Sequence, residues 1–288
     1  MRKTHRKHVI IEPLMNIYGL DFTSAPSHRK PITCATCTLV SGILRVEDFA
    51  EFPGFEGFEV FLAQPGPWIA GLDFPFGQPS KLVRNLQWGN TWEAYVGLIA
   101  RMSKPEFVAT LAAYRQPRPK GDKQHLRRTD EIANSRSPMM LYGVPVGKMF
   151  FEGAPRLLQT GVQVVPCRMN GDSRVVVEAY PALVARKWIE TNGYKSDTKR
   201  KQTAAHRDAR QAIVDGLSAD CRRHYGFEVR LSDELAADFV ADPSGDRLDA
   251  FLCAVQAAWA STQTDYGVPA ECDPIEGWIV DPNAASQD

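Results

Sequence analysis

The segment Tyr18-Gly-Leu-Asp-Phe-Thr23 decides the fold, and it recurs almost unchanged as Ala70-Gly-Leu-Asp-Phe-Pro75. Each segment ends an apolar run and places an aspartate, Asp21 or Asp73, where that run stops. Short apolar runs bounded by turn residues are typical of strands buried in a parallel sheet. Neighbouring strands lie about 4.8 Å apart. We therefore expect the two aspartates side by side at the carboxyl ends of the strands, where the sites of open α/β sheets form.

The surrounding sequence predicts an α/β protein. Further strands are expected at 32–40, 43–49 and 173–180, with Ser41-Gly42 as a hairpin turn between the first two. Helices are expected at 57–63, 146–160, 182–190, 203–225, 233–240 and 246–261, and Thr91 and Ser103 are placed as helix N-caps. The domain prediction is a basic tail at 1–16, a core at 17–77 and 173–280, and a mostly helical insertion at 78–172 between the fourth and fifth strands.

Composition and charge exclude several classes of protein. Apolar residues make up 44% of the 288 residues and charged residues 24%, with 34 basic against 34 acidic. This balance excludes a uniformly basic DNA-coating protein and a highly charged disordered chain. No apolar stretch reaches the roughly 18 residues that cross a bilayer, and no signal-peptide apolar region follows the basic start. We expect a soluble, cytoplasmic protein with no membrane partner.

Six cysteines are dispersed along the chain, and only Cys34 and Cys37 have a spacing seen in metal or redox sites. They fall within a predicted strand, where positions three apart face opposite sides. No second cysteine pair or nearby histidine pair completes a zinc site. We therefore interpret the cysteines as reduced and structural.

Three further acids are placed like Asp21 and Asp73. Glu178 ends the apolar run Val175-Val-Val177, while Asp246 and Asp249 lie one turn apart at the start of an amphipathic helix. Each acid has another explanation when it is taken alone. Asp21 and Asp73 could cap turns, Glu178 could pair with an arginine, and Asp246 could stabilise the helix N-terminus. Three apolar strands that all end in acids would bury several charges, which costs free energy. This cost favours a common function for the acids over three separate explanations.

A shared cation is the simplest purpose for these acids. Carboxylate ligands with few nearby histidines or cysteines favour Mg²⁺ or Mn²⁺ over Zn²⁺. Acids that converge on two such ions form a centre for the attack of water on a phosphodiester. The predicted function is therefore that of a nuclease with two Mg²⁺ or Mn²⁺ ions.

Several segments together resemble a family of unknown function whose members are predicted RNase H-like nucleases, in the ribonuclease H-like superfamily. The matching segments are 19–26, 71–77, 145–156, 177–182 and 245–254. The final Asp-x-x-Asp-Ala is also similar to the Holliday-junction resolvase branch. The resemblance implies a five-stranded mixed sheet in the order 3-2-1-4-5 flanked by helices. It also implies catalytic and metal-binding roles for Asp21, Asp73, Glu178 and Asp249, with Asp246 as a further metal ligand.

Charge is distributed unevenly along the chain. Residues 115–136 hold seven basic residues against three acidic, and residues 186–210 hold eight against three, whereas residues 228–288 hold two against thirteen. Clusters of lysine and arginine bind phosphate backbones, so a nucleic acid, DNA or RNA, is the expected partner. The residues expected to bind it are Arg127, Arg128, Lys148, Arg156 and Lys195. The alternative is that these are solvated, ion-paired faces, with Lys148, Glu152 and Arg156 as a helical salt-bridge ladder.

Two other functions stay open at this point. A catalytically silent nucleic-acid-binding module would use the same basic segments without cutting. A nucleotide-binding phosphotransferase of actin-like fold would share the sheet topology, although the chain has no glycine-rich phosphate loop and only one such domain. A serine hydrolase is disfavoured because no Gly-x-Ser-x-Gly motif exists and the histidines are dispersed.

Overall fold

A computed structural model describes residues 15–190 and 193–285 of the chain, so residues 1–14 of the predicted basic tail lie outside the described residues. The strands in the described part are β1 (Asn16–Asp21), β2 (Ile32–Val40), β3 (Ile43–Phe52), β4 (Trp68–Leu72), β5 (Gln163–Val165), β6 (Arg174–Glu178) and β7 (Glu228–Arg230). They form one mixed sheet in the order β5-β6-β4-β1-β2-β3-β7. The expected α/β class is confirmed.

The sheet differs from the five-stranded arrangement that the resemblance implied. Two three-residue strands, β5 and β7, extend its two edges and were not predicted. β1, β4, β6 and β5 run parallel to one another, whereas β2 is antiparallel to both β1 and β3. The carboxyl ends of β1, β4 and β6 therefore lie at one edge of the molecule, where the acids follow.

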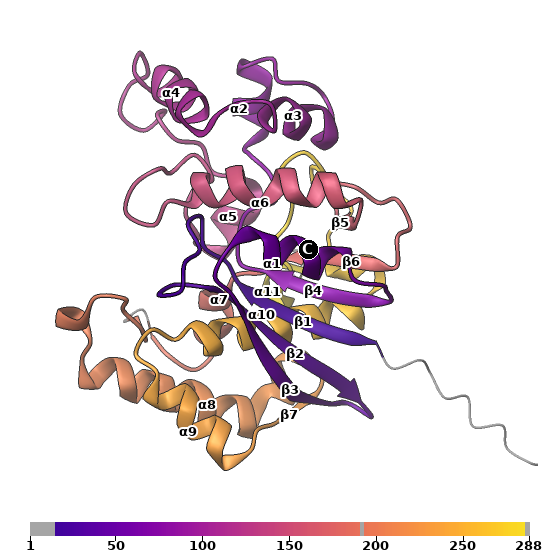
Figure 1. Ribbon diagram of the computed structural model, residues 1–288, viewed down its shortest axis with the longest axis vertical. Helices are drawn as coiled ribbons and strands as arrows, with labels where there is room; N and C mark the ends of the chain where they lie inside the picture. The colour runs from indigo at the N-terminus through magenta and orange to yellow at the C-terminus, as the bar shows by residue number, and fades with distance from the viewer. Residues whose placement is uncertain (1–14, 191–192, 286–288) are drawn as a thin grey trace, which may run out of the picture.

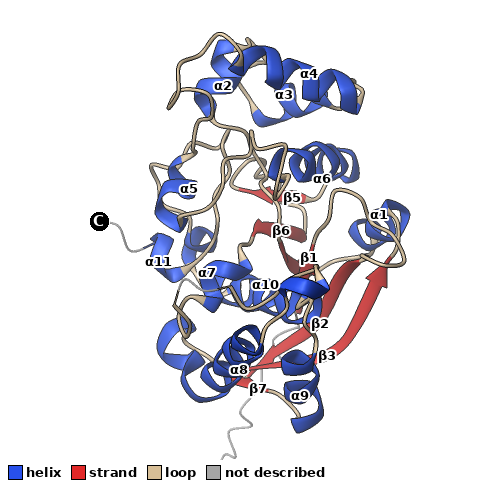
Figure 2. Cartoon of the chain, turned by 90° about the vertical axis from the view of Figure 1, so that its left-hand side faces the viewer, coloured by secondary structure: helices blue, strands red, loops and turns tan. Residues whose placement is uncertain are grey.

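Helices cover both faces of this sheet (Figures 1 and 2). Those of the first half are α1 (Phe55–Ala63), α2 (Ser80–Asn85), α3 (Trp92–Ile99), α4 (Lys104–Arg115), α5 (Arg128–Ala133) and α6 (Val146–Thr160). Those of the second half are α7 (Pro181–Ala185), α8 (Ala204–Tyr225), α9 (Asp233–Ala241), α10 (Asp246–Ser261) and α11 (Pro282–Ala285). Among the described residues, no helix combines the length and the apolar character that a bilayer-spanning segment requires.

Local sequence signals account for several element boundaries. Ser41 and Gly42 both have positive φ angles, 50° and 72°, which is the backbone of a type I′ hairpin turn. Thr91 accepts a hydrogen bond from the Ala94 amide at the start of α3. Ser103 and Glu106 form a complete capping box at the start of α4. The predicted turn and both predicted N-caps are therefore confirmed.

Alternation along the strands divides the interior into two apolar cores. On β1, Tyr18 and Leu20 pack with α1, α3, α4 and α6, while Ile17 packs on the opposite face with α7, α8 and α10. Cys34 belongs to the first core and Cys37 to the second, so the two sulfurs diverge as predicted. All six cysteines are free thiols.

Helix α10 packs against the strands more closely than ordinary side chains allow. A β-carbon on Gly19 would collide with the backbone of Ala250 and Ala254, and one on Gly71 would collide with the carbonyl oxygen of Cys253. These two glycines, one on β1 and one on β4, let the helix backbone rest directly on the sheet. The first turn of α10, with Asp246 and Asp249, is thereby fixed beside the carboxyl ends of β1 and β4.

The segment 78–172, predicted as a helical insertion, contains α2 to α6. It is not entirely helical, since β5 within it pairs with β6 of the sheet. Both views place α2, α3 and α4 at the end of the molecule away from α8 and α9, with α6 between them and the sheet (Figures 1 and 2).

Candidate active site

Three adjacent parallel strands end in acids at the same edge of the sheet. Leu20 of β1 pairs with Leu72 of β4, and Leu72 also pairs with Glu178 of β6. Asp21 and Asp73 therefore follow side by side, and the Asp73 amide donates a hydrogen bond to the Leu20 carbonyl at 3.0 Å. The expected juxtaposition of these two aspartates is observed.

Asp21 and Asp73 are carboxylates without a partner. Asp21 is 6% exposed, and Asp73 is partly buried. Within the described residues, neither side chain makes a hydrogen bond or an ion pair. Burial, opposed by Lys195, raises the pKa of Asp21 to about 6. Burial and the neighbouring charge of Asp21 raise the pKa of Asp73 to about 8. The pair is thus a buried acidic site whose side-chain oxygens have no partner in the part of the chain that the structure describes.

The two acids of α10 are engaged by lysines. Asp249 is 1% exposed and accepts hydrogen bonds from Lys195 Nζ and, at 2.5 Å, from the Tyr194 hydroxyl. Asp246 accepts one from Lys30 Nζ at 2.7 Å. Burial and the charges of Asp73 and Asp21 raise the pKa of Tyr194, which keeps this hydroxyl a donor. Lysine ammonium groups therefore supply the positive charge that balances part of the acid cluster.

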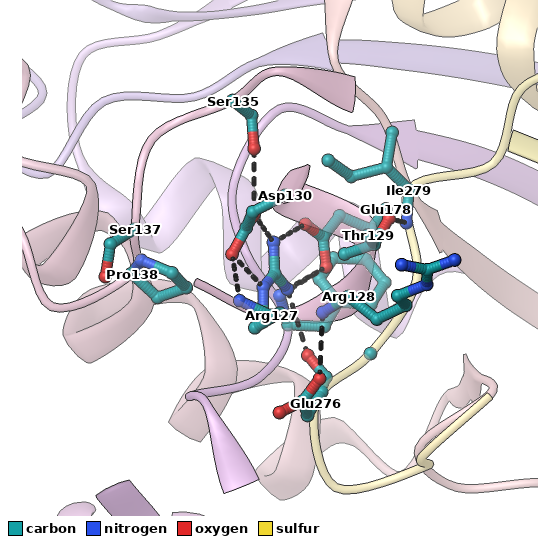
Figure 3. A network of polar contacts seen from close by, with 12 residues as sticks. Arg127, Arg128, Thr129, Asp130, Ser135, Ser137, Pro138, Glu178, Glu276 and Ile279 are labelled. Carbon is teal, nitrogen blue, oxygen red and sulfur yellow. Dashed lines mark hydrogen bonds and ion pairs between the residues drawn. The ribbon is translucent and has the colours of Figure 1, made fainter. Parts of the chain in front are cut away.

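Glu178 has a different environment (Figure 3). Its two carboxylate oxygens accept hydrogen bonds from Arg127 at 2.6 and 2.8 Å, and the Phe76 amide donates another at 2.9 Å. Arg127 also donates to Asp130 at 2.8 and 3.0 Å. The alternative explanation of Glu178, pairing with an arginine, is therefore the one that the structure displays. Both oxygens of Glu178 are therefore occupied by Arg127, and Glu178 is not free to bind a cation.

Arg127 was expected to bind substrate, but its geometry is that of an internal tether. The guanidinium group is 2% exposed, and it also donates to the Glu276 carbonyl oxygen at 2.9 Å. Burial opposes the charge of Arg127, but Asp130 and Glu178 raise its pKa well above the usual value. The side chain thus joins the segment before α5, strand β6 and the chain near residue 276.

A pocket of about 240 Å³ opens beside the acid cluster. Its polar wall includes Asp73, which follows β4, Tyr194 and Lys195, from the loop between α7 and α8, and Asp249, in the first turn of α10. Val144, Val146 and Met149 add apolar side chains to its lining, and the exposed Arg136 also lines it. Such a pocket can hold a ligand that is anionic at one end and apolar at the other.

The other residues expected to bind substrate do not line this pocket. Arg156 donates to Glu59 at 2.9 Å and to Glu152 at 3.1 Å, as in the ladder alternative. Lys148 does not join this ladder, and among the described residues it has no ion-pair partner. Arg128 is exposed and lines a smaller hollow near Trp278. Of the five predicted residues, only Lys195 and Arg127 lie in the pocket.

The sequence reasoning missed three polar residues of the site. Lys30, Tyr194 and Arg136 come from irregular segments, where no period or motif marks a side chain as functional. A weak signal existed for Tyr194, because it directly precedes Lys195 in a segment rich in basic residues. Their placement depends on contacts between residues far apart in the chain, such as Lys30 with Asp246.

The donor chemistry of the site fits a hard divalent cation in part. Asp21 and Asp73 offer free carboxylate oxygens, the ligands that Mg²⁺ and Mn²⁺ prefer. Across residues 15–190 and 193–285, however, no three acid, histidine or cysteine side chains are arranged so that they could hold a metal ion. The hydrogen bonds of Asp249 and Asp246 to lysines explain why a third ligand is not already in place.

The fold and the site define an α/β protein with a mixed sheet and an acid cluster at the carboxyl ends of its parallel strands. The chain belongs to a family described as "Protein of unknown function (DUF429)", whose family model matches residues 19–273. Comparisons with curated proteins and with solved structures gave no significant match.

Proposed function

We propose that the protein hydrolyses phosphodiester bonds of a nucleic acid and depends on Mg²⁺ or Mn²⁺. The observation that carries the proposal is the pair Asp21 and Asp73, two adjacent carboxylates whose oxygens have no partner among the described residues. Desolvation of a charged group is costly unless it is compensated. A divalent cation would supply the compensation, and a lysine would be a weaker substitute.

The ligand set in this proposal is narrower than the one expected from sequence. Asp21 and Asp73 would hold the cation directly, and Asp249 and Asp246 would join them in place of their lysine partners. Glu178 is left out because Arg127 occupies both of its oxygens. Two ions remain the proposed number, with four aspartates available to share them.

The bound cation would lower the pKa of a coordinated water and neutralise charge on the phosphate. The protein's own groups have separate roles. Lys195 and Arg136 would attract the phosphate to the pocket, since cationic groups steer and hold polyanions. Tyr194 would hold Asp249 in position through its 2.5 Å hydrogen bond. Val144, Val146 and Met149 would reduce the access of bulk water to the pocket.

The topology supports a finer assignment to the ribonuclease H-like superfamily, which we also propose. The inner strands lie in the order β3-β2-β1-β4-β6, with β2 antiparallel to its two neighbours. The whole sheet has seven strands and differs from the five-stranded arrangement that the resemblance implied, so the support for this assignment comes from these inner five strands alone.

The test is a cleavage assay with labelled single-stranded, duplex and branched DNA and RNA in Mn²⁺. We expect the wild-type protein to cut at least one substrate, and Asp21→Asn and Asp73→Asn each to lower the rate by about 100-fold or more, because each removes a charged ligand. Asp208→Asn is the matched control, since Asp208 is exposed on α8 and has no ion-pair partner among the described residues.

Three outcomes would overturn the proposal. Undiminished cleavage by Asp73→Asn would remove the acid pair from the reaction. Binding of nucleic acid in EDTA with no cleavage of any substrate in Mn²⁺ would favour the binding-only module. Stabilisation of the wild-type protein by ATP, with no cleavage, would favour the phosphotransferase.

A further inference from the structure

A second hollow, of about 530 Å³, lies between the end of α4 and the segment before α6. We call it the basic hollow and define it by Arg115, Lys120, Lys123 and Tyr142, which line it together with Ala112, Gln116, Gly121 and Gln124. Within the described residues, no acidic side chain lines it. It is larger than the pocket beside Asp73 and has a different chemical character.

The charge of the basic hollow is not neutralised by its surroundings. Asp122 is the one acid between Arg115 and Lys123, and it accepts hydrogen bonds from Lys81 at 2.7 Å and from Arg118 at 2.6 Å. Lys120 and Lys123 are exposed and form no ion pair with any described residue. Three cations therefore surround a hollow in which no acid of residues 15–190 and 193–285 balances their charge, and an external anion could do so.

The loop that carries these cations is anchored rather than free. The Tyr114 hydroxyl is hydrogen-bonded to His125 Nε2 at 2.8 Å and accepts a hydrogen bond from Asn85 at 2.8 Å. The Arg118 guanidinium lies over the Tyr114 ring, 4.0 Å from its centroid. These contacts fix both ends of the segment 115–124, so the basic hollow is formed without a ligand.

Tyr142 adds an aromatic surface to this cationic site. Its side chain is 63% exposed, which is unusual for a large ring that makes no polar contact within the described residues. Aromatic rings beside a positively charged groove are the means by which proteins hold unpaired bases, because every base has a face that can stack. Paired bases in a duplex do not offer that face.

The basic hollow lies near the acid site, because the two are lined by residues two positions apart in the chain. Tyr142 lines the hollow, and Val144, two residues further on, lines the pocket that contains Asp73. Two residues of extended chain span at most about 7 Å. One strand of nucleic acid could therefore occupy both places at once.

We infer that the basic hollow binds a single-stranded segment of the nucleic acid substrate. Lys120, Lys123 and Arg115 hold its phosphates, and Tyr142 stacks on one of its bases. This inference rests on the proposed function, cleavage of a nucleic acid. It narrows the substrate from nucleic acid in general to a strand with unpaired bases near the cleavage point.

The test is binding of fluorescent 20-nucleotide single strands, DNA and RNA separately, and of the matching duplex DNA in EDTA. EDTA removes any cation-dependent cleavage, so binding is measured whether or not the protein cuts. We expect a single strand to bind at least about tenfold more tightly than the duplex, because only unpaired bases stack on Tyr142. Comparison of the DNA and RNA strands identifies which sugar the site accepts.

Two variants separate the charge from the stacking. Lys120→Ala/Lys123→Ala should weaken binding and make the salt dependence shallower by about 1.4 in log–log slope. Tyr142→Ala should weaken single-strand binding about 5- to 150-fold with an unchanged slope, and Tyr142→Phe should restore it. Arg222→Ala/Arg223→Ala at the end of α8 is the matched control, because it removes equal charge far from the hollow.

Wild-type affinity in Lys120→Ala/Lys123→Ala, or preference for the duplex, would overturn the inference. These residues are exposed, so unchanged thermal unfolding of the variants shows that a loss of binding is not a loss of folding. Strand binding at the hollow without any cleavage in Mn²⁺ would overturn the proposed function and leave the binding site standing. Cleavage that is as fast in Lys120→Ala/Lys123→Ala as in the wild-type protein would overturn the binding site and leave the proposed function standing.

Discussion

At the scale of single residues, the notable feature is a pair of carboxylates that the fold brings together without a counter-ion of their own. Asp21 and Asp73 follow neighbouring parallel strands, and burial raises the pKa of both, to about 6 and about 8. Lys195 and Lys30 moderate the charge, but they bind Asp249 and Asp246 instead. Ionisation of these two buried side chains therefore destabilises the folded protein, and a bound cation would reverse this effect.

The raised pKa values predict how stability depends on pH. An acid with a higher pKa in the folded state binds its proton more tightly there, so its contribution is complete below pH 4 and is lost as pH rises through about 6 and about 8. Asp73→Asn cannot ionise. In EDTA at pH 8, we expect this variant to exceed the wild-type free energy of unfolding by about 1–2 kcal/mol.

Chemical denaturation at pH 5 and pH 8 measures this difference. At pH 5 the folded-state Asp73 is still protonated while the unfolded-state carboxyl is already ionised, so the variant's advantage should be present but smaller than at pH 8. A variant that is equally destabilised at both pH values would show that the Asp73 carboxylate is stabilised in the fold, contrary to the account.

At the scale of elements, Arg127 connects parts of the chain that are distant in sequence. It precedes α5, and its guanidinium lies between Asp130 and Glu178 at the end of β6 (Figure 3). Arg127→Met would remove the guanidinium from two buried carboxylates, which would keep only neutral donors such as the Phe76 amide. We expect a loss of about 3–5 kcal/mol in the free energy of unfolding at pH 7.

Denaturation in urea with Arg128→Met as the control measures that loss, since Arg128 is exposed and its nearest ion pair spans 3.7 Å. A change below about 1 kcal/mol for Arg127→Met would mean that the network contributes little to stability. Glu178 would then be available for another role.

The contact of α10 with the sheet gives a second prediction at this scale. Alanine at Gly71 would place a β-carbon against the Cys253 carbonyl oxygen, so α10 and β4 would have to separate. We expect Gly71→Ala to destabilise the protein by about 3 kcal/mol or more. Gly54→Ala, at an extended position with open space around it, is the control. Equal melting temperatures for the two variants would contradict the close packing.

The elements that could be predicted are those with a strong local pattern. β1 and β4 were identified by buried apolar runs, α4 by its capping box and α10 by its amphipathic period. β5 and β7 could not be identified, because three residues do not establish a period. The predicted helix at 182–190 is shorter, ending at Ala185, where the backbone leaves the regular helix.

At the scale of the whole molecule, the acid site could be predicted only where sheet topology dictates it. Parallel strands necessarily bring Asp21, Asp73 and Glu178 to one edge. The cation that pairs with each acid comes instead from a loop far away in the sequence. Arg127 lies 51 residues before Glu178, and Lys30 lies 216 residues before Asp246. No sequence spacing encodes such contacts, so the engaged and the free carboxylates could not be told apart.

Uneven charge is likewise a property of the whole molecule. Part of the acidic C-terminal segment meets the basic insertion internally, as Glu276 accepts hydrogen bonds from Arg127 and the Arg128 amide. Lys120 and Lys123, which form no ion pair with any described residue, line the basic hollow instead. This separation gives the molecule an acidic centre beside a cationic surface, the combination that a cation-dependent enzyme acting on a polyanion requires.

Calorimetric titration with Mn²⁺ at pH 7.5 tests the central claim most directly. We expect the wild-type protein and Asp208→Asn to bind Mn²⁺, and Asp21→Asn/Asp73→Asn, still folded, to lose this binding. Failure of the wild-type protein to bind Mn²⁺, or undiminished binding by the double variant, would contradict the claim that these two carboxylates form a cation site.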